Sequence, residues 1–168
     1  MIEVCQGLFI GSDLDYQAIA SHQNWWIIHA CRDPYHRSLL GYSGRGAPRG
    51  HPEYLIAKRG KEMFLNLVDV NNPSYFSTEI IDAALDWIDQ AVGAGEKVLV
   101  HCNQGESRSP AIGLLYLASQ TNAVSRASLG EAEAEFVKLY PMYNPKPGIR
   151  GFLLQNWDRY IRSATSGQ

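Results

Sequence analysis

The chain has 168 residues, of which 45% are hydrophobic and 19% are charged, and its formal net charge at pH 7 is −2. These values are typical of a single globular domain and exclude a disordered, collagen-like or low-complexity chain. Because the net charge is slightly negative, no overall positive field draws the molecule to nucleic acid or anionic lipid. We therefore expect one domain over residues 1–168, no nucleic-acid partner, and only a local site for any anion.

Hydropathy and the first residues predict where the protein is found. The longest apolar run, 112–118, is far shorter than the about 20 residues that span a bilayer. Residues 1–4 contain no basic segment followed by an apolar stretch, so they do not open a secretory signal. We therefore expect no membrane segment and a cytoplasmic protein. The sequence does not indicate an oligomeric state.

The cysteines and most histidines are not spaced as disulfide partners or metal ligands. Cys5, Cys31 and Cys102 form an odd number at wide spacings, which suits neither a disulfide framework nor a Cys-x2-Cys zinc site. No such pair accompanies the histidines either, so we expect neither a metal nor another cofactor. We interpret four histidines as surface or packing residues: His22, His29, His36 and His51.

In chain order, the first expected elements are short buried strands. Apolar residues at 8–10 and 25–30 predict two strands, with a helical turn between residues 13 and 21. Between residues 32 and 62 the apolar periodicity stops, and five Gly, three Pro and seven Lys or Arg accompany only three acidic residues. We predict a long loop over 32–62, because unpatterned segments of this length are usually functional or mobile loops.

The remaining chain alternates strands with helices. Apolar strands are predicted at 63–68 and 97–100, and between them Ser77 should cap a helix whose apolar residues recur from 80 to 92. The segment 110–118 starts with proline and is apolar nearly all round, which predicts a central helix. Two further helices are expected at 129–139 and 148–162, followed by a short flexible tail at 163–168. This alternation predicts an α/β layer fold.

The segment 101–110, HCNQGESRSP, lies between a predicted strand and the predicted central helix. A loop that enters a helix N-terminus turns successive backbone N–H groups into one concavity, where the helix dipole adds positive charge. Such a site binds an oxyanion and favours the thiolate of a cysteine at its base, here Cys102. Arg108 returns on the other side of the loop, where its guanidinium can hold two phosphate oxygens. The residues expected to surround the anion are Asn103, Gln104, Gly105, Glu106, Ser107 and Arg108.

The spacing Cys-x5-Arg, with His101 before it and Ser109 after it, resembles the phosphate-binding loop of cysteine-dependent protein tyrosine phosphatases. The likeness is greatest to the dual-specificity branch and extends over residues 8–161, weakest at 32–62. Further matches to that branch are Gly105, Leu115-Tyr116-Leu117, Asn144-Pro145 and Gly151-Phe152. The resemblance implies a single-domain phosphatase fold with a central mixed sheet flanked by helices. It also implies hydrolysis of phosphorylated proteins or small phosphoesters through a phosphocysteine intermediate.

Phosphoryl transfer from an ester also needs a proton for the leaving oxygen, and Asp69 is the candidate donor. It ends a predicted strand 33 residues before Cys102, and with Tyr75-Phe76 and the following helix it resembles the family's general-acid loop. The same carboxylate, once deprotonated, would activate water against the phosphocysteine. By resemblance, Ser109 would hydrogen-bond the departing thiolate, and His101 would hold the loop and support a low pKa of Cys102.

Simpler interpretations and other functions stay open at this point. Cys102 could be a buried structural thiol, Asp69 a turn residue, and Ser109 only a helix cap. A charge at Glu106 would repel phosphate if it faced inward, so we expect it to face outward. Two alternative functions are a pseudophosphatase that binds a phosphorylated partner without turnover and a sulfurtransferase-like domain. The resemblance also disfavours inositol lipids as substrates, because phosphatases that act on polyphosphorylated inositol lipids have basic residues at the variable loop positions, and this loop has no Lys or Arg there.

Two further hypotheses concern the segment before residue 62. Arg32, Arg37, Arg45 and Arg49 could form a positive rim that steers anionic substrates, or they could belong to a solvated loop. Cys31 ends the predicted strand before this segment, and parallel strands bring their C-terminal ends together. Its strand resembles that of phosphoinositide phosphatases in which a second cysteine forms a reversible disulfide with the nucleophile. Cys31 is therefore a redox candidate toward Cys102, with simple packing as the alternative.

Overall fold

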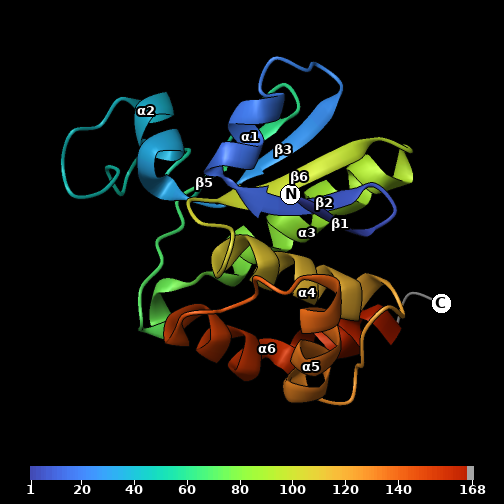
Figure 1. Ribbon diagram of the computed structural model, residues 1–168. Coiled ribbons are helices and arrows are strands. Elements are labelled where there is room, and N and C mark those ends of the chain that lie inside the picture. Colours follow the sequence, from blue (N-terminus) through green and yellow to red (C-terminus); the bar gives the residue numbers. More distant parts are fainter. Residues whose placement is uncertain (166–168) are drawn as a thin grey trace.

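A six-stranded mixed sheet forms the centre of the molecule in our computed structural model, which describes residues 1–165 and the side chains of 1–162 (Figure 1). The strand order is β1-β2-β6-β3-β5-β4. The four inner strands are parallel, and each edge strand is antiparallel to its neighbour. The strands are β1 (Ile2–Cys5), β2 (Leu8–Ser12), β3 (Trp25–His29), β4 (Ile56–Arg59), β5 (Glu62–Leu65) and β6 (Lys97–Cys102).

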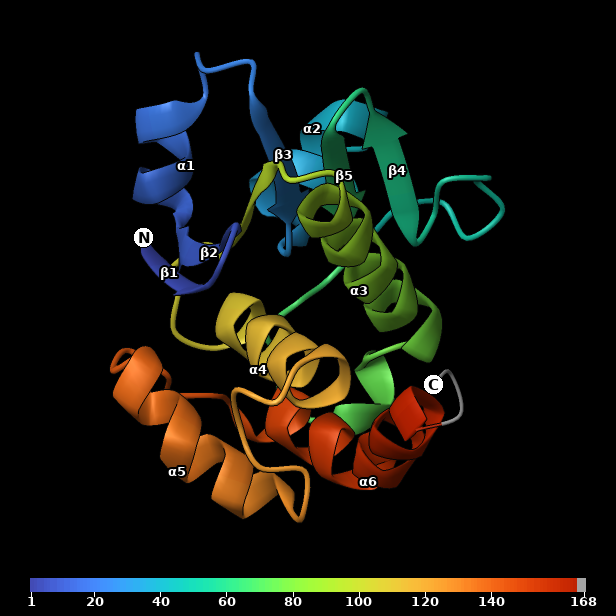
Figure 2. The same ribbon diagram turned by 90° about the vertical axis from the view of Figure 1, so that its right-hand side faces the viewer.

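Helices cover both faces of this sheet. The α-helices are α1 (Asp13–Ile19), α2 (Arg37–Leu40), α3 (Thr78–Gly93), α4 (Arg108–Gln120), α5 (Leu129–Leu139) and α6 (Pro147–Thr165). In Figures 1 and 2, α1 lies on one face, α3 and α4 lie on the other, and α5 and α6 pack against the far side of α4. Within residues 1–165 we find no helix that is both long enough and apolar enough to cross a bilayer.

The predicted central strand and helix have the expected burial. β6 is buried from Val98 to Cys102, and α4 is buried along its whole length except at Gln120. The predicted cap of α3 is present, because Ser77 Oγ accepts a hydrogen bond from Glu79 N at 3.2 Å. The β6–α4 unit is therefore enclosed by protein on all sides, and the loop between them is held by its surroundings.

The prediction of a continuous loop over 32–62 was wrong. This segment contains a short helical turn, η1 (Arg32–His36), then α2, and finally β4. A two-residue connection with Gly60 at a φ of 57° joins β4 to β5, as tight hairpin turns require. β4 was missed because an edge strand pairs on one side only and tolerates charged residues such as Lys58 and Arg59. The edge strand β1 was not predicted either.

Element ends differ from the predictions by a few residues. β5 ends at Leu65 and not at residue 68, so Asp69 stands in a connecting segment. α6 continues through Thr165 and includes three residues that we expected in a tail. The rest of the predicted tail, 166–168, lies outside the described residues.

The first turn of α6 packs against the segment that follows Asp69. A Cβ atom added at Gly148 would lie 1.9 Å from the carbonyl oxygen of Val70, and one at Gly151 would lie 2.6 Å from Pro73 Cγ. Only glycine permits this approach, since the obstacle at Gly148 is backbone. The position of the Asp69 segment therefore depends on a helix about 80 residues later in the chain.

We predict that Gly148→Ala lowers the free energy of unfolding by about 1–3 kcal/mol, the usual cost of overpacking. In a domain of this size the melting temperature should fall by roughly 3–9 °C in calorimetry. Gly130→Ala in α5 is the matched control, because a Cβ atom added at Gly130 would have no neighbour within 4 Å. That control should be neutral or slightly stabilising; equal losses in both variants would contradict the close packing at Gly148.

Candidate active site

The candidate nucleophile, Cys102, ends β6 at the edge where three parallel strands stop together. β6 lies between β2 and β3, with Cys102 opposite Ser12 and His101 opposite His29. Loops at the carboxyl ends of parallel strands form the usual ligand crevice of α/β folds. Cys102 is only 2% exposed, so its sulfur is accessible from one direction at most.

The loop from 103 to 107 is held by hydrogen bonds to its carbonyl groups. Asn103 O accepts from Asp13 N at 3.3 Å, Gly105 O from the Tyr140 hydroxyl at 2.7 Å, and Glu106 O from Asn144 N at 2.8 Å. In a trans peptide the C=O and the following N–H point in opposite directions. The amides of Gln104, Glu106 and Ser107 therefore turn toward the inner side of the loop, where they can bind an anion.

Gly105 is required for two reasons. Its φ of 74° lies in the left-handed region, which favours glycine. A Cβ atom there would also lie 2.9 Å from Gly11 C and 3.0 Å from Ser12 N. The loop thus packs directly on the end of β2, which no other residue type would allow.

The loop encloses a cavity of ≈ 290 Å³ together with segments from elsewhere in the chain. Its lining residues are Asp69, Cys102, Asn103, Gln104, Glu106, Ser107, Arg108, Asn144 and Lys146. The structure thus places the candidate nucleophile, clamp and acid around one space. Lys146, which the sequence analysis did not single out, adds a cation; the Asn144-Pro145 match was the only signal near it.

Ser109 lies directly beside the nucleophile. Its Oγ is 3.2 Å from Cys102 Sγ and 3.1 Å from Gly11 O, and its side chain is fully buried. The hydroxyl has one proton, which it donates to Gly11 O while it accepts from the Cys102 thiol. If the sulfur becomes a thiolate, the same proton can turn to it.

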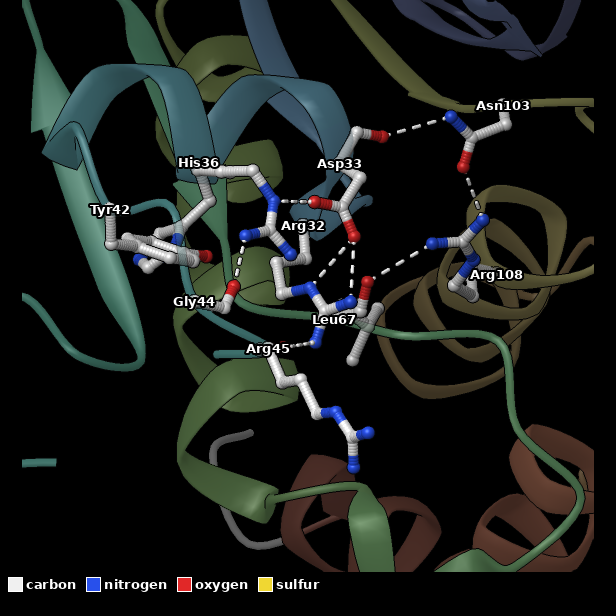
Figure 3. Close-up of polar contacts among 10 residues, drawn as sticks. Arg32, Asp33, His36, Tyr42, Gly44, Arg45, Leu67, Asn103 and Arg108 are labelled. Atoms are coloured by element: carbon white, nitrogen blue, oxygen red, sulfur yellow. Dashed lines mark hydrogen bonds and ion pairs between the residues drawn. The ribbon is translucent and has the colours of Figure 1, made fainter. Parts of the chain in front are cut away.

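Arg108 is buried and held from two sides (Figure 3). One terminal nitrogen donates to Leu67 O at 3.0 Å, and the other donates to Asn103 Oδ1 at 2.6 Å. Its Nε has no hydrogen-bond partner among the described residues and lies 3.9 Å from Asp69 Oδ2. A buried, unpartnered donor of a cation beside a cavity is suited to an incoming anion.

Asp69 lines the same cavity from the segment that follows β5. Its Oδ1 accepts from Ser107 Oγ at 2.9 Å, and its Oδ2 lies 3.6 Å from Lys146 Nζ. Ser107 Oγ also accepts from Lys146 N at 3.0 Å. Asp69 is therefore a carboxylate that hydrogen bonds and nearby cations orient beside the cavity.

His29, interpreted from the sequence as a surface or packing residue, packs in the core and also contacts His101. It is fully buried, with its Nδ1 2.6 Å from His101 Nε2 and its Nε2 2.8 Å from Glu62 Oε2. Burial lowers the pKa of His29 and, together with His29 itself, lowers the pKa of His101 to about 3. The strand register could have shown this contact, since His29 and His101 each precede a cysteine by one or two residues at the ends of neighbouring strands.

Two of the four arginines in the expected positive rim have structural partners. Figure 3 shows Arg32 beside the carboxylate of Asp33, to which Arg37 also donates. The hydrogen bonds from both arginines outweigh partial burial and lower the pKa of Asp33. They also donate to Arg45 O and Gly44 O. These two guanidiniums therefore close the 41–46 loop instead of extending toward substrate.

Asp33 also connects this segment to the phosphate loop. Its carbonyl oxygen accepts from Asn103 Nδ2 at 2.9 Å, and Asn103 in turn holds Arg108 (Figure 3). Asn103 thus has a positioning contact that spacing alone did not show. Glu106 is half-buried and contributes to the cavity lining.

Cys31 is fully buried in the same core cluster as Cys102, and both are free thiols. Burial raises the pKa of the Cys31 thiol to about 12, although Arg108 acts in the opposite direction. A thiol in this state is a weak nucleophile.

Residues 49–134, just over half of the chain, match the family model described as dual specificity phosphatase, catalytic domain. The curated human protein named dual specificity protein phosphatase 5 is 36% identical over 85 residues. That match covers 51% of this chain and 21% of the human protein, so the chain spans about a fifth of this relative's length.

Solved structures share the fold at low sequence identity. PTPMT1 matches with a TM-score of 0.65 and 16% identity over 99% of each chain. Human DUSP28 matches with a TM-score of 0.62 and 19% identity over 100% of each chain. A human tyrosine phosphatase-like serine/threonine/tyrosine-interacting protein matches at 0.61 and 21% identity, over 96% of this chain and 97% of that one. The predicted phosphatase-like fold is thereby confirmed.

We predict that Asn103→Ala raises the Kd for inorganic phosphate about tenfold in calorimetric titration, a loss of about 1.4 kcal/mol. The reason is that Arg108 loses the acceptor that holds one of its terminal nitrogens. Gln104→Ala is the control, since Gln104 is exposed on the same loop and its side chain makes no hydrogen bond within the described residues. Equal weakening in both variants would exclude a specific role for the Asn103 amide.

Proposed function

The chain belongs to the family of dual-specificity phosphatase catalytic domains, and from this premise we propose that it hydrolyses phosphomonoesters through a phosphocysteine intermediate. The observation that carries the proposal is the single cavity lined by Cys102, Arg108 and Asp69. A core thiol would need neither a buried cation nor an oriented carboxylate across a common space. The family match also disfavours the sulfurtransferase-like alternative.

In the first step, the Cys102 thiolate attacks phosphorus and the bond from phosphorus to the leaving oxygen breaks. Asp69 donates its proton to that oxygen, so a neutral alcohol or phenol departs. Arg108 and the inward amides of Gln104, Glu106 and Ser107 hold the equatorial oxygens as their charge redistributes. The product of this step is a phosphocysteine at Cys102.

In the second step, water replaces the alcohol on the same side of the phosphorus. The Asp69 carboxylate takes a proton from the water as its oxygen attacks, and the bond between Cys102 Sγ and phosphorus breaks. Ser109, 3.2 Å from the sulfur, turns its hydroxyl proton from Gly11 O to the departing thiolate. Inorganic phosphate leaves, and Asp69 is again protonated.

The proposed substrates are phosphorylated proteins or small phosphoesters. The variable loop positions Asn103, Gln104, Glu106 and Ser107 carry no basic side chain, and Lys146 is the only lysine that lines the described cavity. A polyphosphorylated inositol ring would bring several negative charges beside Asp69 and Glu106. The electrostatics therefore favour a substrate with a single phosphate in the cavity.

The experiment that tests this function compares the hydrolysis of phosphomonoesters by the protein and two variants. Cys102→Ser should abolish turnover. Asp69→Asn should slow alkyl phosphates roughly 10²–10⁴-fold and aryl phosphates with acidic leaving groups far less, because only the former need the proton. The alkaline fall of kcat/KM should flatten in Asp69→Asn, since asparagine has no proton to lose.

Two outcomes would contradict the proposal in different ways. Equal losses on both substrate classes would remove Asp69 from the role of acid. The alternative of binding without catalysis would be established by a different result: the unchanged protein hydrolyses no phosphoester but binds a phosphopeptide, and Arg108→Ala loses that binding.

We also propose a redox role for Cys31 in protecting this nucleophile. Peroxide oxidises the Cys102 thiolate to a sulfenic acid and is reduced to water; the Cys31 sulfur then attacks, a disulfide forms, and water leaves. The burial that raises the pKa of Cys31 makes this attack slow. Peptide mapping after mild peroxide should find a peptide linking Cys31 to Cys102, and Cys31→Ser should lose the activity that thiols restore. Without the linked peptide, Cys31 is a packing residue.

A further inference from the structure

We propose that Glu62 and His29 act as positioning residues for the active-site histidine, holding the His101 ring with its proton on Nε2 and its Nδ1 bare behind Cys102. The inference rests on the proposed function, because it concerns the same nucleophile. The Cys-x5-Arg motif contains neither of these two residues. They come from β5 and β3, and neither lines the cavity.

The two histidines are fixed by the sheet itself. His29 and His101 lie opposite each other on the neighbouring parallel strands β3 and β6, so their side chains leave the same face of the sheet. Their ring nitrogens, Nδ1 of His29 and Nε2 of His101, are 2.6 Å apart. Both side chains are fully buried, which shields this contact from bulk water.

Aromatic rings prevent either histidine from rotating. Tyr16 from α1 stacks on His101 with ring centroids 4.8 Å apart and an interplanar angle of 4°. Tyr35 and Phe64 stack on His29 at 4.3 and 4.4 Å. Both orientations are therefore determined by packing, so the remaining freedom is the position of the protons.

Glu62 determines the first proton position. Its Oε2 lies 2.8 Å from His29 Nε2, and the side chain is 39% exposed. The hydrogen bond from His29 lowers the pKa of Glu62, so the carboxylate is ionised at neutral pH and can only accept. His29 Nε2 must therefore carry a proton.

The second position follows from the first. Burial lowers the pKa of both rings, that of His101 to about 3, so each ring is neutral with one proton at pH 7. His29, protonated at Nε2, offers a lone pair at Nδ1, and His101 Nε2 must donate to it. His101 Nδ1 is then unprotonated, and it is the atom of this ring that lacks a hydrogen-bond partner among the described residues.

The other tautomer of His101, with the proton on Nδ1, is also stabilised by a neighbouring group, so the two tautomers compete. The main chain of Cys102 favours a proton on the His101 ring. Without Glu62, we expect the His101 proton to move to Nδ1, toward that main chain. The other titratable and charged groups that face the pair are Asp13, Asp15 and Tyr16 from α1, Tyr35 from η1, and Arg108 from α4.

The test is the 15N chemical shift of the His101 ring nitrogens in the full chain, which does not depend on turnover. In the unchanged protein, Nε2 should be protonated and Nδ1 bare from about pH 6 to 8. Glu62→Ala, and more weakly Glu62→Gln, should shift the His101 proton toward Nδ1. Both changes are at a half-exposed side chain, so the fold should persist.

A second readout is the alkylation of Cys102 by iodoacetate as a function of pH. In Glu62→Ala the midpoint should move to lower pH, because a ring N–H directed at the Cys102 main chain stabilises a nearby thiolate. The kcat for an aryl phosphate should fall about tenfold, the usual scale for a residue that orients a functional histidine.

Glu96→Ala is the matched control. Glu96 is also a half-exposed carboxylate with two side-chain partners, Trp26 and Lys61, but it contacts neither histidine. It should leave the tautomer and the alkylation midpoint unchanged. The proposal is overturned if His101 keeps one tautomer in all four proteins, or if Glu96→Ala shifts it as much as Glu62→Ala. If the unchanged protein shows no turnover of any phosphoester, the proposed function is rejected, but the tautomer measurement stays valid because it does not depend on turnover.

Discussion

The site depends above all on hydrogen bonds that the carbonyl groups of the loop 103–107 accept from other parts of the chain. Three of these groups accept hydrogen bonds from donors at the start of α1, the end of α5 and the segment before α6. The amides have to point the other way, so the anion-binding side of the loop is a consequence of where those distant segments lie. A short isolated peptide with the same sequence would pay the entropy of ordering five residues with none of these bonds. The whole domain is thus the support of one loop.

The cationic segment before residue 62 illustrates how charge is used for structure. Its excess of basic residues suggested a surface that attracts substrate, yet Arg32 and Arg37 converge on Asp33 and on two backbone carbonyls. Partly exposed ion pairs contribute little each, but here two arginines share one carboxylate and form a network: Arg32 reaches Asp33 Oδ2 through two nitrogens, and Arg37 donates to Oδ1. Their effect is to fix Asp33, whose own carbonyl orients Asn103 and through it Arg108. A segment with no expected secondary structure therefore positions Asn103, one of the residues that line the active-site cavity.

The range of each interaction in the chain decides which features could be predicted from the sequence. The β6–loop–α4 unit could be predicted because nucleophile, clamp and strand-to-helix transition all lie within about ten residues, and α3 could be predicted from its apolar period and Ser77. β4 could not, because its stability comes from pairing with β5 and not from its own residues. The role of His29 was hidden for the same reason: a histidine followed by Ala-Cys has no meaning until the register places it opposite His101. The sequence predicted that Asp69 lies between a strand and a helix, but not that the segment after it packs against α6, because that contact depends on Gly148.

The buried polar groups behind the nucleophile share a physical logic. Ser109 has one proton and two acceptors, Gly11 O and the sulfur, so a charge on Cys102 withdraws a hydrogen bond from the end of β2. α1 starts directly after β2. At this junction Ser12 N donates to the Asp15 carboxylate, and Asp13 N donates to the carbonyl oxygen of Asn103 in the loop. His101, on the other side, is connected through His29 to Glu62 at the surface. Because unsatisfied groups are costly in a water-free interior, the Ser109 hydroxyl can turn to the sulfur only if Gly11 O gives up its hydrogen bond at the end of β2. The hydrogen bonds behind Cys102 therefore extend to α1 on one side, and those of the neighbouring His101 extend to Glu62 at the start of β5 on the other.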